Sequence, residues 1–173
     1  QNITVNVTNV NDNIPSITSS ATFSAAENQT AIGTVTATDA DGDTLTYSLS
    51  GSDASSMSIN SSSGVLTFSS APDYEAKTSY TAIVTASDGT NSTSQAITIS
   101  VTDVDDVAPV FTSSATFSAA ENQTAIGTVT ATDVDTDNSS ITFSISGSDL
   151  SITSGGVLTF ASAPDYETHL NCL

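Results

Sequence analysis

A near-perfect internal repeat limits what this chain can fold into more than any other feature. The segment ATFSAAENQTAIGTVTATD occupies residues 21–39 and returns unchanged at 115–133. Two further pairs recur around it in the same order: QNITVNVTNV at 1–10 with QAITISVTDV at 95–104, and GVLTFSSAPDYE at 64–75 with GVLTFASAPDYE at 156–167. Such self-similarity at a fixed period is typical of tandem structural repeats.

The spacing of the repeated segments divides the chain into three parts. We expect these parts to be the last strand and linker of a preceding repeat at 1–14, a complete repeat at 15–108, and a truncated second repeat at 109–173. Because the truncated repeat stops before its last two strands, its core and sheet edges would stay open. We therefore expect residues 110–173 to be poorly folded in isolation.

Apolar side chains alternate with Thr and Ser at every second position, as at Ile97, Ile99 and Val101. This alternation is typical of strands with one buried and one solvated face, and no stretch has helical periodicity. The sequence therefore predicts an all-β fold, a Greek-key immunoglobulin-like β-sandwich, without the Cys pair and Trp of antibody domains. The strands expected in the complete repeat are 17–25, 32–38, 44–50, 57–60, 64–69, 79–87 and 94–103.

Aromatic side chains are expected to supply most of the large apolar area of each core. In the complete repeat they are Phe23, Tyr47, Phe68 and Tyr80. In the second repeat they are Phe117, Phe143 and Phe160, with Cys172 in the place of Tyr80.

The chain carries 19 acidic side chains and one basic side chain, which gives a formal net charge of −18. Without cations to replace released counterions, it would repel nucleic acid and anionic membranes. The acidic residues cluster at the expected strand ends, where two carboxylates ~5 Å apart repel by about 3 kcal/mol at an effective dielectric of ~20. Ca²⁺ relieves such crowding because it takes about 6–8 oxygen ligands. Zinc prefers Cys and His, and the chain has only His169 and Cys172, both in its divergent tail.

Five short motifs carry most of this acidity: AAEN, ATDAD, PDYE, ASDG and NVNDN. In their order and spacing they resemble the Glu, Asp-x-Asp, Asp-x-Glu, Asp and linker motifs of tandem cadherin repeats, and four of them recur in the second copy. The resemblance covers the chain up to about Glu167. The second linker departs from the family pattern at Asp105 and Val107, where the family has Asn.

The resemblance implies that Ca²⁺ binds where consecutive repeats meet. Two ions at the second junction would take Glu27, Asp73, Glu75, Asp106, Asp135 and the Val104 carbonyl. A third ion there would take Asp105, Asp133, Asp135 and the carbonyls of Val107 and Asn138. At the first junction the implied ligands are Asn11, Asn13, Asp39, Asp41 and Asp88, with Asp12 facing the preceding repeat. The residues that face a third junction are Glu121, Asp165 and Glu167. Outside these motifs, Asp43, Asp53, Asp137 and Asp149 are expected to be solvated turn residues.

These inferences favour a calcium-dependent extracellular cell-adhesion protein, homophilic or heterophilic, whose bound ions stiffen the array of repeats. The near-perfect duplication and the Lys-poor composition favour a large microbial surface adhesin, anchored to a membrane through parts outside this sequence. The alternatives are a passive spacer in a secreted surface protein, or a carbohydrate-binding module that recognises polysaccharide through Tyr74 and Tyr166. An enzyme is excluded because His169, Lys77 and Cys172, each the only one of its kind, form no catalytic set.

Overall fold

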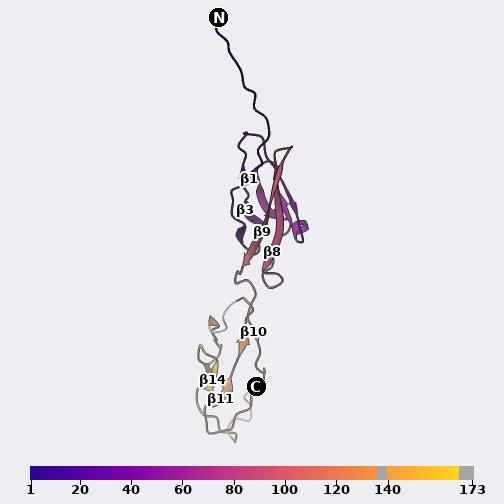
Figure 1. Ribbon diagram of the computed structural model, residues 1–173. Coiled ribbons are helices and arrows are strands. Elements are labelled where there is room, and N and C mark those ends of the chain that lie inside the picture. Colours follow the sequence, from indigo (N-terminus) through magenta and orange to yellow (C-terminus); the bar gives the residue numbers. More distant parts are fainter. Residues whose placement is uncertain (136–139, 168–173) are drawn as a thin grey trace. The chain divides into compact units, whose positions relative to one another are not determined.

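The regular structure of the chain is almost entirely β, as predicted (Figure 1). The computed structural model describes residues 1–135 and 140–167. These residues form two compact units, one from Gln1 to Val104 and one that begins at Asp105. One short 3₁₀ helix, η1 (Ala54–Ser56), interrupts the strands of the first unit. No helix among the described residues is long and apolar enough to cross a membrane.

The first unit is a sandwich of two main sheets. Its four-stranded sheet has the order β2-β9-β8-β5, and its three-stranded sheet has the order β3-β7-β6. The strands β1 and β4 form a separate two-stranded sheet. The bounds of these strands are β1 (Ser16–Ile17), β2 (Thr22–Ala26), β3 (Ala31–Thr34), β4 (Ala37–Thr38), β5 (Thr46–Ser50), β6 (Met57–Ile59), β7 (Val65–Phe68), β8 (Ser79–Ser87) and β9 (Ser92–Thr102).

The core of the first unit is mainly aliphatic. Its fully buried large side chains, Leu66, Ile99, Val35 and Val84, come from both main sheets and the loop after β3. Of the four aromatic residues expected to fill the core, only Phe68 is buried. The other three, Phe23, Tyr47 and Tyr80, are partly buried and pack against this centre. A tyrosine reaches the margin because its hydroxyl needs a polar partner.

Two of the expected strands are each divided in the structure. The expected strand 17–25 forms β1 and β2, and the expected strand 32–38 forms β3 and β4. The halves belong to different sheets, since β1 pairs with β4 whereas β2 pairs with β9 and β3 pairs with β7. The chain therefore changes sheets within two segments that were each expected to form one strand.

Residues 1–10, expected to be the last strand of a preceding repeat, are not paired as a strand with any described residue, and their assignment to that repeat stays a prediction. Ile3, Val5 and Val7 keep the alternating pattern, but their exposed fractions are 84%, 78% and 93%. The equivalent segment 95–104 forms most of β9, which is paired on both sides by β2 and β8. A strand needs a neighbouring strand to form its ladder, and the described residues offer none to this segment.

The second unit repeats only part of this sandwich. Its strands form a pair, β10-β12, and a three-stranded sheet, β11-β14-β13. Among its described residues Leu158 is the one buried apolar side chain, and Phe117, expected in the core, is 37% exposed. The division of the chain at residues 14 and 108 stays a prediction, and Cys172 lies outside the described residues. The bounds are β10 (Val110–Phe111), β11 (Ala125–Thr128), β12 (Ala131–Thr132), β13 (Leu150–Ile152) and β14 (Val157–Phe160).

Candidate metal-binding sites

One acidic cluster of the first unit lies where β2 and β9 end. These two strands run parallel, with Ala26 opposite Thr102, so their carboxyl ends meet at the same end of the sheet. Glu27, which follows β2, donates its backbone N–H to the Thr102 carbonyl at 3.1 Å. The parallel pairing thus places Glu27 beside Val104, which is far away in the sequence.

The Glu27 side chain is held by two backbone donors. It is only 3% exposed, and its two carboxylate oxygens accept the N–H groups of Val104 at 2.8 Å and Tyr74 at 2.7 Å. Hydrogen bonds to an ionised group are stronger than those between neutral groups, and they offset the cost of burying the charge. Glu27 therefore ties the ends of β2 and β9 to the loop after β7.

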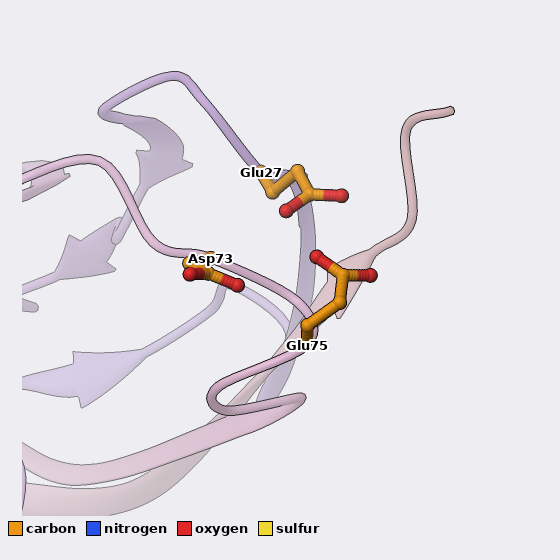
Figure 2. Close-up of side chains that lie close together, drawn as sticks. All are labelled: Glu27, Asp73 and Glu75. Atoms are coloured by element: carbon orange, nitrogen blue, oxygen red, sulfur yellow. The ribbon is translucent and has the colours of Figure 1, made fainter. Parts of the chain in front are cut away.

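Two further carboxylates approach Glu27 from that loop. Glu27, Asp73 and Glu75 each place one carboxylate oxygen within 4.8 Å of the others, and Figure 2 shows Glu27 and Glu75 pointing toward each other. Asp73 is oriented by the Ala76 N–H, which it accepts at 3.1 Å. The only Lys or Arg of the chain, Lys77, pairs with Asp53 at 2.5 Å instead. Three negative charges are thus gathered where no Lys or Arg can neutralise them.

A second acidic cluster lies at the opposite end of the first unit. Asp39, Asp41 and Asp43 place carboxylate oxygens within 4.8 Å of one another. Asp41 accepts the backbone N–H groups of Asp12 at 3.0 Å and Asn13 at 2.8 Å, and the Asn13 side-chain amide at 2.7 Å. The hydrogen bonds from Asn13, then that from Asp12, hold the pKa of Asp41 below its usual value.

Asp88 belongs to the same end of the first unit. Burial alone would raise its pKa, but hydrogen bonds from the backbone of Asn91 and Thr90 and from the Asn11 and Asn91 side chains lower it. The Asn91 side chain also donates to the Asn13 carbonyl at 3.1 Å. The structure therefore brings Asn11, Asn13 and Asp88 together, as expected.

Three carboxylate oxygens of this cluster have no hydrogen-bond partner. They are one oxygen each of Asp39, Asp43 and Asp88, and all three are shielded from solvent. A buried carboxylate oxygen without a partner is unfavourable, and a cation removes that cost. We define Asn11, Asn13, Asp39, Asp41, Asp43 and Asp88 as the amino-end cluster, and Glu27, Asp73 and Glu75 as the carboxyl-end cluster.

Asp43 and Asp53 were expected to be solvated turn residues, and both expectations are wrong. Asp43 joins the amino-end cluster, where burial and then the charges of the neighbouring carboxylates raise its pKa. In the sequence, its position two residues after Asp41 was the feature that could have indicated a place in this cluster. Asp53 pairs with Lys77 and accepts the Thr81 N–H at 2.8 Å, and these bonds lower its pKa.

Asp149 and Asp137 were also expected to be solvated turn residues. Asp149 is exposed, as expected, and one of its oxygens accepts the Ser148 hydroxyl at 3.1 Å. Asp137 lies outside the described residues, as does Asn138, an expected calcium ligand.

The second unit repeats the arrangement around Asp41 at its own start. Asp135 accepts the backbone N–H of Asp106 at 2.7 Å and also that of Val107, while its own N–H donates to Asp133 at 3.2 Å. One Asp135 oxygen is shielded and has no hydrogen-bond partner. Asp105, which precedes these residues, is exposed.

A third acidic group lies at the far end of the second unit. Glu121, Asp165 and Glu167 place carboxylate oxygens within 4.8 Å of one another, as Glu27, Asp73 and Glu75 do, but all three are exposed. Glu121 accepts the backbone N–H of Tyr166 at 3.0 Å. This group is a more open version of the carboxyl-end cluster.

The aromatic side chains give little support to the alternative of a carbohydrate-binding surface. Tyr166 is 70% exposed, but Tyr74 packs against the core of the first unit. Stacking on a sugar ring needs an exposed aromatic face, so the first unit does not offer the surface that was expected of Tyr74.

Comparison with known proteins places this fold and these acidic motifs in one family. The model of the cadherin domain matches residues 20–102. The mouse protein "Cadherin EGF LAG seven-pass G-type receptor 1" is 36% identical over 154 residues, which cover 82% of this chain and 5% of that protein. Human "Protocadherin Fat 4" is 38% identical over 161 residues, which cover 85% of this chain and 3% of that protein. The chain thus spans a small fraction of these curated relatives.

Solved structures give the same result. Human Protocadherin-24 EC1-2 superposes with a TM-score of 0.78 at 22% identity, covering 91% of this chain and 81% of that one. Mouse Cadherin-23 EC22-24 superposes with a TM-score of 0.69 at 30% identity, covering 91% of this chain and 57% of that one. Cadherin domains are adhesion modules that generally bind Ca²⁺ and are not enzymes, which confirms that the chain has no catalytic function. The relatives above are animal proteins, and a microbial source stays a prediction. Fold, motifs and comparisons together identify this chain as an array of cadherin-like repeats.

Proposed function

We propose that the acidic clusters bind Ca²⁺, and that the bound ions stiffen consecutive repeats of an extracellular adhesion protein. The observation that carries the proposal is the set of shielded carboxylate oxygens of Asp39, Asp43 and Asp88, which have no hydrogen-bond partner. The chain has one Lys and no Arg with which to neutralise its 19 acidic side chains. A divalent cation that prefers oxygen ligands satisfies both conditions.

The donor set of the amino-end cluster suits Ca²⁺ better than other metals. It consists of carboxylates and amide oxygens, with neither Cys nor His, and this composition disfavours zinc. Loops of different origin supply the donors: the segment before β1, the loop after β4 and the loop after β8. Ca²⁺ tolerates such irregular geometry, whereas Mg²⁺ demands an octahedron and keeps several waters.

We extend the proposal to the junction between the two repeats on the strength of the family resemblance. Three ions there would be held by seven carboxylates with the carbonyls of Val104 and Val107. Seven negative charges would then face six positive ones, a nearly balanced site. The carboxylates are Glu27, Asp73, Glu75, Asp105, Asp106, Asp133 and Asp135.

The remaining parts of the proposal concern the whole protein. The structure of Protocadherin Gamma B2 is described as one of extracellular cadherin domains, and we propose the same location for this chain, on a surface and anchored through parts outside the sequence. Its partners would be Ca²⁺, neighbouring repeats and other surface proteins or polysaccharide. The alternative is a passive spacer whose stability does not depend on calcium.

Thermal unfolding of the full 173-residue chain in rising Ca²⁺, with Mg²⁺ as control, tests the proposal. Ligand at about 100 times its Kd stabilises a fold by ~2.7 kcal/mol, which is roughly 10–20 °C for a unit of this size. Asp88→Asn should remove much of this gain, whereas Asp149→Asn, the same change at an exposed turn, should not. If Mg²⁺ raised the Tm as much as Ca²⁺, or if Ca²⁺ did not raise the Tm, the function left would be that of a passive spacer.

A further inference from the structure

The one lysine of the chain lies in the loop that carries two residues of the carboxyl-end cluster. Lys77 follows Glu75 by two residues, and its backbone N–H donates to the Asp73 carbonyl at 2.9 Å. This bond closes a single helical turn, in which Asp73 and Lys77 are four residues apart. An acidic side chain followed four residues later by lysine is a favourable spacing for an ion pair. The local sequence therefore favours a pair between Lys77 and Asp73.

The structure pairs Lys77 with a distant residue instead. Its Nζ lies 2.5 Å from the Oδ1 of Asp53, which is 24 residues away in the sequence. The same Nζ lies 4.5 Å from the centre of the Tyr80 ring, whose face attracts a cation. Tyr80 in turn contacts the buried Phe68, with ring centres 5.0 Å apart. The ammonium group is thus held by a carboxylate and an aromatic ring of the first unit.

Asp53 is itself fixed to the strand β8. Its backbone N–H donates to the Thr81 carbonyl at 3.2 Å, and its Oδ2 accepts the Thr81 N–H at 2.8 Å. Its carbonyl accepts the N–H of Ser56, the last residue of η1, at 2.9 Å. The Asp53 side chain is 19% exposed, whereas that of Lys77 is 44% exposed. Asp53 is therefore the anchored partner of the pair, and the flexible lysine is the one that can move.

The position of this lysine matters because its charge would compete with a metal ion. The carboxyl-end cluster gathers three carboxylates whose oxygens lie within 4.8 Å of one another. An ammonium group on any of them would occupy oxygens that Ca²⁺ needs at the same time, since Ca²⁺ takes about 6–8 oxygen ligands. Its positive charge would also repel the ion. A lysine held elsewhere therefore favours cation binding at this cluster.

We propose that Asp53 is a positioning residue that keeps the only lysine of the chain away from the carboxyl-end cluster, so that a cation, and not Lys77, neutralises these carboxylates. Asp53 acts on binding through Lys77 and does not touch the cation. The part that concerns Ca²⁺ rests on the proposed function, whereas the placement of the lysine does not. The competing explanation is that Asp53 only fastens η1 to β8.

Two substitutions separate these explanations. Asp53→Asn keeps an oxygen that accepts the Thr81 N–H but removes the charge that holds Lys77. Lys77→Gln removes the positive charge itself and keeps a side chain of similar length. If Asp53 acts by holding the lysine, adding Lys77→Gln should cancel the effect of Asp53→Asn on Ca²⁺ binding. If Asp53 only fastens η1, the effect should persist in the double variant.

A Ca²⁺ titration of the full chain in about 0.1 M NaCl, followed by the NMR signals of backbone amides, resolves the two clusters of the first unit. The Tyr74 amide donates to Glu27 and reports on the carboxyl-end cluster. The Thr90 amide donates to Asp88 and reports on the amino-end cluster in the same sample. Each titration therefore contains its own internal control.

Asp53→Asn should weaken the Ca²⁺ binding seen at Tyr74 about 3- to 10-fold, the range expected for a new exposed ion pair together with its repulsion of the ion. The binding seen at Thr90 should change less than ~2-fold. The double variant with Lys77→Gln should return to within ~2-fold of the wild type. Asp149→Asn, the same substitution at an exposed turn of the second unit, should also stay within ~2-fold.

The placement of the lysine can be tested without calcium. Lysine labelled with ¹⁵N at Nζ gives one ammonium signal, because the chain has a single lysine. In EDTA, Asp73→Asn should shift this signal in the Asp53→Asn chain, where Lys77 reaches the cluster. The same substitution should leave the signal unchanged when Asp53 is present.

Three results would overturn the inference: unchanged Ca²⁺ binding in Asp53→Asn, a weakening that persists in the double variant, or an ammonium signal that does not respond to Asp73→Asn in the Asp53→Asn chain. If Ca²⁺ moves neither amide signal of the wild type, the proposed function fails. The labelled lysine then decides separately whether Asp53 keeps Lys77 away from the cluster.

Discussion

The substitution Glu27→Gln separates the structural work of this side chain from metal binding. In the metal-free protein the Glu27 carboxylate accepts the N–H groups of Val104 and Tyr74. Glutamine has nearly the same shape, but its amide nitrogen is a donor, so one of the two backbone N–H groups loses its acceptor. Because Glu27 is 3% exposed, water cannot replace that acceptor.

The expected cost follows from the lost hydrogen bond. Bonds to charged groups contribute about 1.5–3 kcal/mol, so Glu27→Gln should lower the free energy of unfolding by about 2 kcal/mol, or ~8–16 °C in Tm for a unit of this size. Removing a charge also relieves repulsion from Asp73 and Glu75. Both of these carboxylates are exposed, and in 0.5 M salt the Debye length is only ~4 Å. The hydrogen-bond loss should therefore dominate.

Urea unfolding in EDTA and 0.5 M NaCl, followed by near-ultraviolet circular dichroism of the tyrosines, measures this cost. Three of the four tyrosines, Tyr47, Tyr74 and Tyr80, lie in the first unit, so the signal reports mainly on that unit. Glu121→Gln makes the same change in the same local sequence at an exposed site and should cost less than ~0.5 kcal/mol. Equal effects of the two substitutions, or a more stable Glu27→Gln protein, would refute the reasoning.

Three other substitutions test particular contacts of the first unit. Gly64→Ala should lower the free energy of unfolding in urea by about 3 kcal/mol, because φ is +70° and the new Cβ would lie 2.1 Å from a carbonyl oxygen. Its control, Gly42→Ala, has a similar φ of +80° but open space around the new Cβ, so it should cost about 1 kcal/mol. Asp53→Asn should destabilise the chain at pH 7. Hydrogen bonds from Lys77 and a backbone N–H lower the folded pKa of Asp53, so its stabilisation is present above about pH 4 and is lost as the pH falls through the folded value. Asp43→Asn should raise Tm in EDTA and reduce the gain in Ca²⁺, since burial and like charges raise the pKa of Asp43 and disfavour its ionised form in the metal-free fold.

Much of the sandwich could be predicted because the alternation of apolar residues specifies which face of each strand is buried. The long expected strands at 79–87 and 94–103 closely match β8 and β9. The change of sheet between β1 and β2 was not predicted, because the residues from Ile17 to Phe23 were expected to form one strand although Ser19 and Ser20 interrupt their alternation. A change of sheet depends on which distant strands are available as partners, and local periodicity carries no information about them.

The candidate ligands were predictable to a similar extent. The resemblance to the cadherin motifs indicated Asp39, Asp41 and Asp88, which the structure gathers at one end of the first unit. The hydrogen bond between Glu27 and Val104 was not predicted, because it depends on the parallel pairing of β2 and β9 across 77 residues. Asp43 was missed because an acidic residue beside a glycine turn has the same sequence pattern whether it faces solvent or neighbouring carboxylates.

The unchanged repeat shows why a motif alone does not define such a site. Residues 21–39 and 115–133 have one sequence, yet Glu27 is buried with two backbone donors whereas Glu121 is exposed. The difference lies in the partner strand, since β9 turns the segment before Glu27 into β2 and no described strand does so before Glu121. The motif supplies the carboxylates, and strand pairing from distant sequence fixes their geometry. A carboxylate already fixed loses less conformational entropy on binding a cation, so the cluster of Glu27 should bind Ca²⁺ more tightly than that of Glu121.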